Sequence, residues 1–281
     1  MSPRPSISGA AQVGGIAGRP ITHSLSPVIH NAWIAAAGMD AAYVPFAPAD
    51  AAGFEVLVAA GRAGLLRGLN ITAPFKQQAF ALADEASEAA RLSGSANVLV
   101  FRDGWVRADS TDGLGMMRAL AEQAPDLDVR GQAVVLLGAG GAARAAAGAL
   151  VGAGATVRIV NRSRERAEAL AADLGPAVSV IADAEAFEGA ALIINALSIQ
   201  PDLDLARLDA RTVVMDMTYR PIATPLLIAA RARGLITVDG LGMLIGQAGP
   251  SFEAIFGVAP PPLDLRPLLL ATLETGLGEA G

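Results

Sequence analysis

The chain has 281 residues, with 21 lysines and arginines, 27 aspartates and glutamates, two histidines, no cysteine and a formal net charge of −6. Without cysteine it has neither disulfides nor thiolate metal ligands, and His23 and His30 are too few for a typical His-rich zinc site. The acidic balance with scattered arginines argues against nucleic acid as the main partner. We therefore expect neither a metal site nor a nucleic-acid partner.

The length predicts two domains of roughly 100 to 150 residues each. Residues 1–12 contain Arg4 but no apolar h-region, which predicts a disordered leader and not a signal peptide. The longest uncharged alanine-rich run, residues 145–157, is too short to cross a bilayer and is interrupted by glycine. The sequence therefore predicts no membrane segment, and we expect a cytoplasmic protein.

Residues 13–17 are expected to form a strand, followed by a loop and a helix from Ser26 to about residue 36. Ser26 suits the helix cap and Pro27 the first helical position. Capping leaves Ser24 unexplained. Two hydroxyls that flank one residue can both bind a polyhydroxylated or carboxylated ligand, although a plain loop explains the spacing equally well.

A strand at 42–47, a helix at 50–60 and a strand at 66–72 come next, and the last strand runs into Asn70, Thr72 and Lys76. Open α/β sheets bind ligands at such strand-to-helix junctions. Lys76 is the only lysine among the 21 basic residues. Unlike arginine, a lysine can lose its proton and take part in proton transfer. Coding bias that left one surface lysine is the alternative.

Helices are expected at 74–83 and 85–92, and Asp103-Gly104 predicts a hairpin of strands at 95–101 and 105–108. Asn97 lies near the start of this hairpin and Asp112 just beyond its end. Asp112 either caps a helix over 113–122 or has a catalytic role, and the two are compatible because a cap position fixes a side chain well. Residues 125–131 are turn-like and suggest a boundary.

The next stretch predicts a strand at 133–137, a glycine turn and a helix. Gly138, Gly140 and Ala143 occupy the positions of a dinucleotide-binding pattern: the first permits the tight turn, the second a close approach to pyrophosphate, and the third close packing of the helix on the strand. The unpaired N–H groups at the helix start can then hold phosphates. A glycine turn that binds nothing is the alternative.

A second strand, at 156–160, ends about 20 residues past the glycines, where the unit requires it. It is followed by Asn161, Arg162, Ser163 and Arg166 in the segment NRSRER. An NAD site needs an acidic residue at this point, whereas a 2'-phosphate needs cations and short polar donors. The sequence therefore predicts NADP over NAD. The alternative is a solvated, arginine-rich first helical turn.

The remaining segments continue an alternation of strands and helices. Strands are expected at 178–182, 190–196, 212–217 and 236–238, and helices up to 174 and at 225–233, 242–255 and 264–275. This order predicts a parallel, doubly wound sheet. Gln247 shares one face of its helix with Met243 and is either functional or a surface residue.

The motifs taken together resemble the shikimate dehydrogenase family. They are Ser-x-Ser-Pro at 24–27, Asn-Ile-Thr-x-Pro-x-Lys at 70–76, Asn97, Thr-Asp-Gly at 111–113, Gly-Ala-Gly-Gly at 138–141, Asn-Arg-Ser at 161–163, Asp-Met-x-Tyr-x-Pro at 216–221 and Gly-Met-Leu-x-x-Gln at 242–247. Their order, over about residues 13–257, is far more specific than any one of them.

The resemblance implies an α/β fold in which an N-terminal substrate domain and a Rossmann-like, doubly wound parallel-sheet NADP domain are joined, with the C-terminal helices returning to the substrate domain. With the strand pattern, it places the substrate domain at 13–112 and 242–281 and the NADP domain at 113–241. It implies a catalytic pair, Lys76 and Asp112. It implies these substrate-binding residues: Ser24, Ser26, Asn70, Thr72, Asn97, Tyr219 and Gln247. It implies these cofactor-binding residues: Gly138, Ala139, Gly140, Gly141, Ala142, Asn161, Arg162, Ser163, Arg166, Met217 and Gly240.

The activity implied is the reversible NADP-dependent reduction of 3-dehydroshikimate to shikimate, on the way to chorismate and the aromatic amino acids, by a monomer or homodimer. The chain departs from the family pattern at Ser110, at Ser95-Ala96, and at 197–200, where the family has Thr-Ser-x-Gly. The last departure lies in a loop near the nicotinamide in this family.

Three alternatives stay open. A quinate or broad-specificity shikimate/quinate dehydrogenase would share the fold and the catalytic pair. A dinucleotide-binding sensor without turnover is supported only by the loop departures. A methyltransferase would fit the glycine loop but leaves the arginine-rich segment without a role.

Overall fold

The structure is a computed structural model that describes residues 7–181, 184–197, 199–201 and 203–275. The chain divides into two compact units. The first unit comprises residues 1–111 and 248–281, and the second comprises residues 112–247. Each is an α/β unit, as the sequence predicts, and each is built on a six-stranded sheet.

The sheet of the first unit is mixed, with strand order β2-β1-β3-β5-β6-β4. Its strands are β1 (Gln12–Ala17), β2 (Ala41–Phe46), β3 (Gly68–Ile71), β4 (Glu85–Ala86), β5 (Val98–Arg102) and β6 (Trp105–Asp109). β1 pairs in parallel with β2 and β3, while β5 runs antiparallel to both β3 and β6. The predicted hairpin forms, with Asp103 and Gly104 both at positive φ in its turn.

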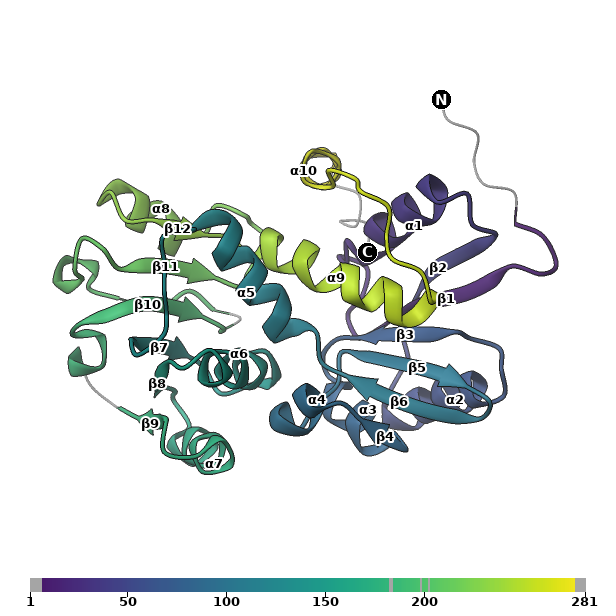
Figure 1. The fold of residues 1–281 in the computed structure, drawn as a ribbon, viewed down its shortest axis with the longest axis horizontal. Helices are drawn as coiled ribbons and strands as arrows, with labels where there is room; N and C mark the ends of the chain where they lie inside the picture. Colours follow the sequence, from purple (N-terminus) through teal and green to yellow (C-terminus); the bar gives the residue numbers. More distant parts are fainter. Residues whose placement is uncertain (1–6, 182–183, 198, 202, 276–281) are drawn as a thin grey trace. The chain divides into compact units, whose positions relative to one another are not determined.

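Helices cover both faces of this sheet (Figure 1). They are α1 (Ser26–Ala36), α2 (Ala51–Arg62), α3 (Lys76–Ala81), α4 (Glu88–Ser93) and the second half of α9 (Gly240–Phe256); α10 (Arg266–Glu274) also belongs to this unit. One apolar core joins α2, α3 and α4 to the sheet through Phe54, Phe75 and Ala90, and the Phe54 and Phe75 rings stack.

The opposite face carries α1 and the end of α9. Gly14 on β1 and Gly68 on β3 are register partners. A Cβ added at Gly14 would lie 3.0 Å from the Phe256 ring, and one added at Gly68 would lie 2.8 Å from Ile255. These two glycines therefore let α9 lie close against the strands. Trp33 of α1 and Phe252 of α9 meet edge to face beside them.

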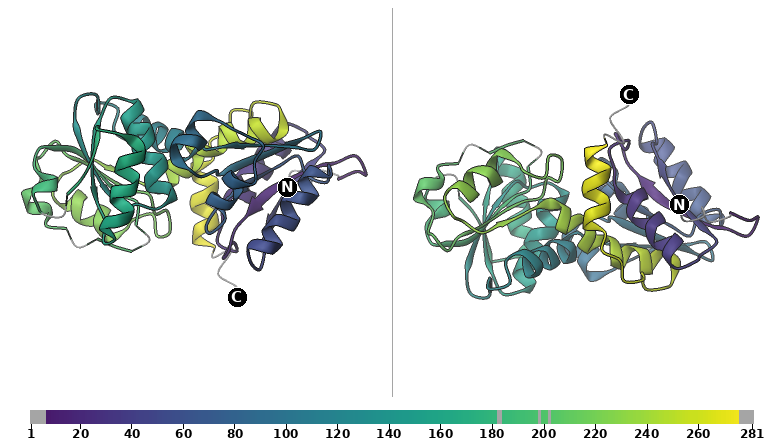
Figure 2. Two further views of the ribbon diagram at one scale, coloured as in Figure 1. Left: turned by 90° about the horizontal axis from the view of Figure 1, so that it is seen from below. Right: turned by 90° about the horizontal axis from the view of Figure 1, so that it is seen from above.

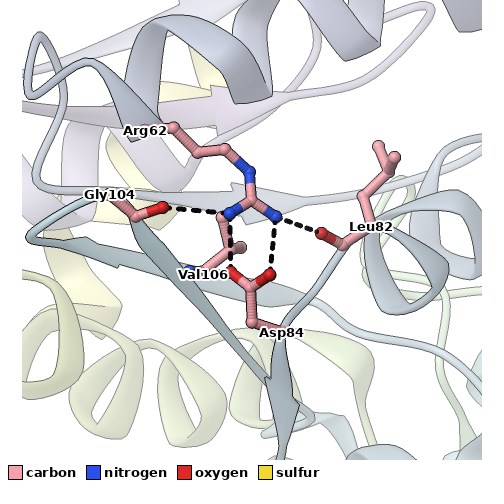
Figure 3. A network of polar contacts seen from close by, with 5 residues as sticks. All are labelled: Arg62, Leu82, Asp84, Gly104 and Val106. Carbon is pink, nitrogen blue, oxygen red and sulfur yellow. Dashed lines mark hydrogen bonds and ion pairs between the residues drawn. The ribbon is translucent and has the colours of Figure 1, made fainter.

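An ion-pair network fastens the β5–β6 hairpin to α2 (Figure 3). The Arg62 guanidinium donates to both carboxylate oxygens of Asp84, at 2.6 and 3.1 Å, and to the carbonyls of Gly104 and Leu82. Asp84 also accepts from the Val106 N–H. The hydrogen bond from Arg62, followed by the one from Val106, lowers the pKa of the Asp84 carboxyl below its usual value.

The second unit has an all-parallel sheet with strand order β12-β11-β10-β7-β8-β9. Its strands are β7 (Ala133–Leu137), β8 (Thr156–Val160), β9 (Val178–Val180), β10 (Ala190–Asn195), β11 (Val213–Asp216) and β12 (Thr237–Val238). Its helices are α5 (Asp112–Gln123), α6 (Gly141–Gly152), α7 (Arg164–Leu174), α8 (Pro225–Ala232), the first half of α9, and the 3-10 turns η1 (Ala184–Phe187) and η2 (Leu205–Arg207).

Alternate residues of the central strands enter two different cores, which is why these strands are apolar throughout. Val134 and Leu136 pack with α5, α6 and α7, while Val135 and Leu137 pack with η2 and α8. Figure 2 has α6 and α7 in front of this sheet when it is seen from below and α8 in front when it is seen from above. The doubly wound parallel sheet is confirmed.

Some local predictions are wrong. Ser26 does not cap α1: Leu25 holds the cap position without a side-chain hydrogen bond, and the Ser24 hydroxyl accepts from the Ser26 N–H at 3.3 Å. The helix expected at 85–92 begins later, because Glu85 and Ala86 pair with β6 as strand β4, and Ser87 caps α4.

The expected leader is ordered where the structure describes it, and its residues 1–6 lie outside the described part. Ser8 donates from its N–H and its hydroxyl to the Asp40 carboxylate, and Gln12 is the first residue of β1, opposite Ala41. Within the described ranges no helix combines the length and the apolar character that a membrane crossing requires.

Candidate functional site

The candidate substrate residues of the first unit meet at one edge of its sheet. β1 and β3 are parallel and both end there, at Ala17 and Ile71. Because β5 is antiparallel to β3, its first residue, Val98, lies opposite Asn70, and Asp109 at the end of β6 lies opposite Val98. The segments after β1, after β3, before β5 and after β6 therefore share this edge, whereas the junction argument predicts only that Asn70, Thr72 and Lys76 lie together.

The loops after β1 and β3 lie in direct contact. A Cβ on Gly18 would fall 2.2 Å from Thr72 Cγ2, and only glycine leaves room for that approach. The Arg19 N–H donates to the Ala73 carbonyl at 3.0 Å and the Thr72 N–H to the Ala17 carbonyl at 2.9 Å. Backbone bonds therefore hold the loop that leads to Ser24 beside Thr72.

Asn97 is held by a network of buried polar groups. It is 4 % exposed, its Oδ1 accepts from the Thr111 N–H at 2.8 Å, and its Nδ2 donates to the Thr111 hydroxyl at 3.0 Å. The Thr111 hydroxyl in turn lies 3.3 Å from the hydroxyl of Ser251 on α9. Neither Thr111 nor Ser251 is a predicted site residue.

Asn70 is also 4 % exposed and fully oriented by its neighbours. Its Oδ1 accepts from the Tyr43 hydroxyl at 2.7 Å, and its Nδ2 donates to the Asn97 carbonyl at 3.2 Å. Sequence reasoning missed Tyr43, because no local pattern links a strand tyrosine to an asparagine 27 residues away.

Lys76 is the first residue of α3 and is partly buried. Its carbonyl accepts from the Ala96 N–H at 2.9 Å, which ties the start of α3 to the segment that carries Asn97. Ser26 is buried at 3 %, and Ser24 is partly buried. The structure thus brings Asn70, Thr72, Lys76 and Asn97 to one edge, beside the loop of the two serines.

Three further predicted residues belong to the second unit. Asp112 begins α5 and is 8 % exposed, Tyr219 lies in the loop after β11, and Gln247 is 8 % exposed on α9. A Cβ on Gly115 would fall 2.6 Å from Gln247 Cβ, so α5 and α9 cross closely at this glycine. Gln247 Nε2 donates to the Leu244 carbonyl at 3.0 Å.

The glycine turn after β7 has the predicted form. Gly138 has φ 114°, a backbone conformation that residues other than glycine rarely adopt. Gly140 directly precedes the first residue of α6. A Cβ added to Gly140 would meet no atom within 4 Å, so its backbone faces open space. Ala143 is fully buried in the core between α6 and the sheet. The turn therefore leaves the backbone of Gly140 beside open space, directly before the N–H groups that begin α6.

The segment after β8 carries cations that point outward. Arg162 and Arg166 are exposed, whereas Asn161 is partly buried and donates from Nδ2 to the Ser163 carbonyl at 2.7 Å. Ser163 holds the cap position of α7 without a side-chain hydrogen bond. Arg164 is paired with Glu168 at 2.7 Å and is not a predicted site residue.

The strand ends beside this turn hold a buried polar pair that sequence reasoning missed. Asp216 is fully buried, and its Oδ1 accepts from Asn195 Nδ2 at 3.2 Å and from the Thr218 N–H at 3.0 Å. A Cβ on Gly240 would fall 2.3 Å from the Met217 carbonyl, so these two predicted residues are close neighbours. The sequence signal for this pair is that each of the two apolar strands ends in a polar residue, Asn195 in β10 and Asp216 in β11.

The types of side chain and backbone group in the two candidate sites limit the ligands that each site can bind. Among the described residues, no cluster of three His, Asp or Glu side chains could hold a metal ion. The first unit offers an amine, amides and hydroxyls at one edge, which suits an oxygen-rich ligand. The second offers backbone amides and exposed guanidiniums, which suit phosphates.

Two family models match the chain. The shikimate dehydrogenase substrate binding domain covers residues 16–99, and the shikimate / quinate 5-dehydrogenase model covers residues 119–201. A shikimate dehydrogenase (NADP(+)) of Caulobacter vibrioides is 53% identical over 95% of this chain and 98% of its own length. The chain belongs to the shikimate dehydrogenase family.

Solved structures of family members agree with this assignment. The chain is similar to shikimate 5-dehydrogenase from Listeria monocytogenes in complex with shikimate and NAD, with TM-score 0.84 and 31% identity over 91% of this chain and 95% of that one. It is also similar to the Thermus thermophilus enzyme in complex with NADP(H) and shikimate, with TM-score 0.81 and 30% identity over 95% and 97%. The family resemblance read from the motifs is confirmed.

Proposed function

We propose that the protein is an NADP-dependent shikimate dehydrogenase, which reduces 3-dehydroshikimate reversibly to shikimate in the aromatic amino acid pathway. The observation that carries the proposal is the convergence of Asn70, Thr72, Lys76 and Asn97 at one sheet edge of a family member. The Caulobacter relative, 53% identical, bears the same activity in its name.

Lys76 carries the central chemical role. Reduction of a ring ketone adds a hydride to the carbonyl carbon and leaves negative charge on the oxygen, which must also receive a proton. The Lys76 ammonium stabilises that charge and donates the proton. Asp112 orients the amine and biases its protonation. The polar groups that hold the hydroxyls and carboxylate of the substrate are Ser24, Ser26, Asn70, Thr72, Asn97, Tyr219 and Gln247.

The residues present fit NADP. The space beside Gly140 admits a close pyrophosphate, and Arg162 and Arg166 are exposed cations where a 2'-phosphate would need them. When bound, NADPH supplies the hydride. The residues that hold it are Gly138, Ala139, Gly140, Gly141, Ala142, Asn161, Arg162, Ser163, Arg166, Met217 and Gly240. We further propose a cytoplasmic monomer or homodimer with the substrate domain at 13–112 and 242–281.

The test is the initial rate of absorbance change at the nicotinamide band, with shikimate or quinate and with NADP or NAD. The highest kcat/KM is expected for shikimate with NADP. A preference for quinate with NAD would replace the proposal by the quinate dehydrogenase alternative, which the family model's description also covers. No turnover in any pairing, with NADP still bound, would favour the sensor.

A further inference from the structure

A buried chain of groups leads from the aromatic core of the first unit to Asn70. The ring of His30 stacks on that of Tyr43, with centroids 4.0 Å apart and planes 8° from parallel. His30 is fully buried and Tyr43 is 1 % exposed. The Tyr43 hydroxyl then reaches out of this core to Asn70 Oδ1 at 2.7 Å.

The neighbours of Asn70 permit only one orientation of its amide. The Asn97 carbonyl can only accept, and it already accepts from the Ile71 N–H at 2.8 Å, so the atom of Asn70 beside it must be Nδ2. Oδ1 then faces Tyr43, and the phenol must be the donor. Burial raises the pKa of the Tyr43 hydroxyl well above its usual value, which keeps the proton on it.

This arrangement leaves one defined donor. An asparagine amide has two N–H groups, and the contact with Asn97 uses one of them. In the described part of the chain, Asn70 Nδ2 makes no second hydrogen bond. The remaining N–H is therefore available to a ligand, in a plane that Tyr43 and Asn97 fix from opposite ends of the amide.

We propose that Tyr43 is a positioning residue for substrate binding: its hydroxyl holds the Asn70 amide so that the second N–H donates to an oxygen of a polyhydroxylated carboxylate. The inference rests on the proposed function. Packing alone does not require the hydroxyl, since phenylalanine would stack on His30 equally well. A buried hydroxyl is costly unless it is hydrogen-bonded, and here its partner is Asn70.

The experiment compares steady-state kinetics of Tyr43→Phe with those of the wild-type protein. Without the hydroxyl the amide can turn, so the KM for shikimate is expected to rise about threefold to tenfold, the range for one lost hydrogen bond. The KM for NADP should stay within about twofold, because Tyr43 and the glycine turn belong to different units. An unchanged KM for shikimate in a folded Tyr43→Phe protein would overturn the proposal.

Trp33→Phe is the matched control. Trp33 meets the same His30 ring edge to face at 5.8 Å, but within the described residues no hydrogen bond links it to Asn70, whose partners are Tyr43 and the Asn97 carbonyl. A general loosening of the aromatic core would raise the KM in both variants, whereas loss of the hydroxyl link raises it only in Tyr43→Phe. Equal changes in the two variants would count against the positioning role.

A double-mutant cycle tests whether Tyr43 acts through Asn70. In an Asn70→Ala background, or Asn70→Ser if the alanine variant does not fold, Tyr43→Phe should have no further effect on the KM for shikimate. If Tyr43→Phe raises the KM for shikimate as much in that background as in the wild-type protein, the proposal is overturned. The same holds if the Asn70 variant itself has an unchanged KM for shikimate. Neither outcome would contradict the proposed function.

A spectroscopic readout separates this proposal from the proposed function. The side-chain amide resonances of Asn70 should shift in Tyr43→Phe and not in Trp33→Phe. If the wild-type protein turns over neither shikimate nor quinate, the proposed function fails. The positioning role is then tested by adding shikimate to the wild-type protein and recording the side-chain amide resonances of Asn70. If shikimate does not shift these resonances, the positioning role is overturned.

Discussion

In the first unit the candidate substrate side chains Asn70 and Asn97 are buried and held by hydrogen bonds, whereas in the second unit the candidate cofactor groups are glycine backbone and exposed arginines. Asn70 and Asn97 are each 4 % exposed and joined through the Asn97 carbonyl. Gly140 and Arg166 instead face solvent. A change in the first unit should therefore disturb several groups together, while changes in the second should act singly.

The largest effect is expected for Lys76→Met. Removal of the amine takes away both the charge stabilisation and the proton source, so kcat should fall about 100-fold to 10,000-fold. NADP binding should be unchanged, because the glycine turn lies in the other unit. Initial rates and NADPH fluorescence titration measure the two quantities. Arg67→Met, which removes an exposed cation of the same unit, is the control, and near-normal turnover of Lys76→Met would contradict the assignment.

The next effect concerns the choice of cofactor. Arg166→Ala removes an exposed guanidinium proposed to bind the 2'-phosphate, and one charged hydrogen bond of about 1.5–3 kcal/mol corresponds to a rise of about 10-fold to 100-fold in the KM for NADP. The KM for NAD, which lacks that phosphate, should not change. Arg164→Ala is the matched control, because Arg164 is already paired with Glu168. A similar rise for both cofactors would place Arg166 outside the 2'-phosphate site.

Gly138→Ala tests the backbone character of the second unit. At φ 114°, and with an added Cβ 3.3 Å from Leu197, alanine is strained by about 1–3 kcal/mol. We expect a lower midpoint of urea unfolding and weaker NADP binding. Gly152→Ala, in α6 and with nothing within 4 Å of the added Cβ, should be neutral or stabilising. Equal behaviour of the two variants would show that the turn tolerates a side chain.

The same contrast explains what the sequence could predict. Strand-turn-helix patterns are local, so the parallel sheet, the Gly138 turn and the junction after β3 that carries Asn70, Thr72 and Lys76 were all predictable. The buried side-chain links were not. Thr111 and Ser251 lie 140 residues apart, and Tyr43 and Asn70 lie 27 apart, so their contacts exist only through tertiary packing.

Local errors have local causes. The position of Ser26 directly before Pro27 predicts a cap of α1, but Ser24, two residues earlier, supplies the hydroxyl that accepts from the Ser26 N–H. β4 has only two residues, which is too short for a periodic pattern, and its strand character comes from pairing with β6. Such elements are defined by a partner strand and not by their own sequence.

The smallest effect concerns pH, and it depends on the ion pair that fastens the hairpin of the first unit. The pKa of Asp84 is lowered in the folded protein by the Arg62 hydrogen bond first and by the Val106 N–H second. Its contribution to stability is therefore complete above the unfolded pKa, about 3.9, and is lost as the pH falls through the lower folded value. Asp84→Asn should have a lower urea midpoint than the wild-type protein at pH 7, and the difference should shrink below about pH 4.

The Asp84 measurement also tests whether the network acts as a unit. Asp103→Asn, in the turn of the same hairpin, removes an equal charge outside the Arg62 contacts and is the control. If Arg62 and Asp84 act together, Arg62→Met should show the same loss at pH 7, and the double variant should add little to it. Additive losses would mean that the carbonyls of Gly104 and Leu82, which Arg62 also bonds, hold the hairpin without the carboxylate.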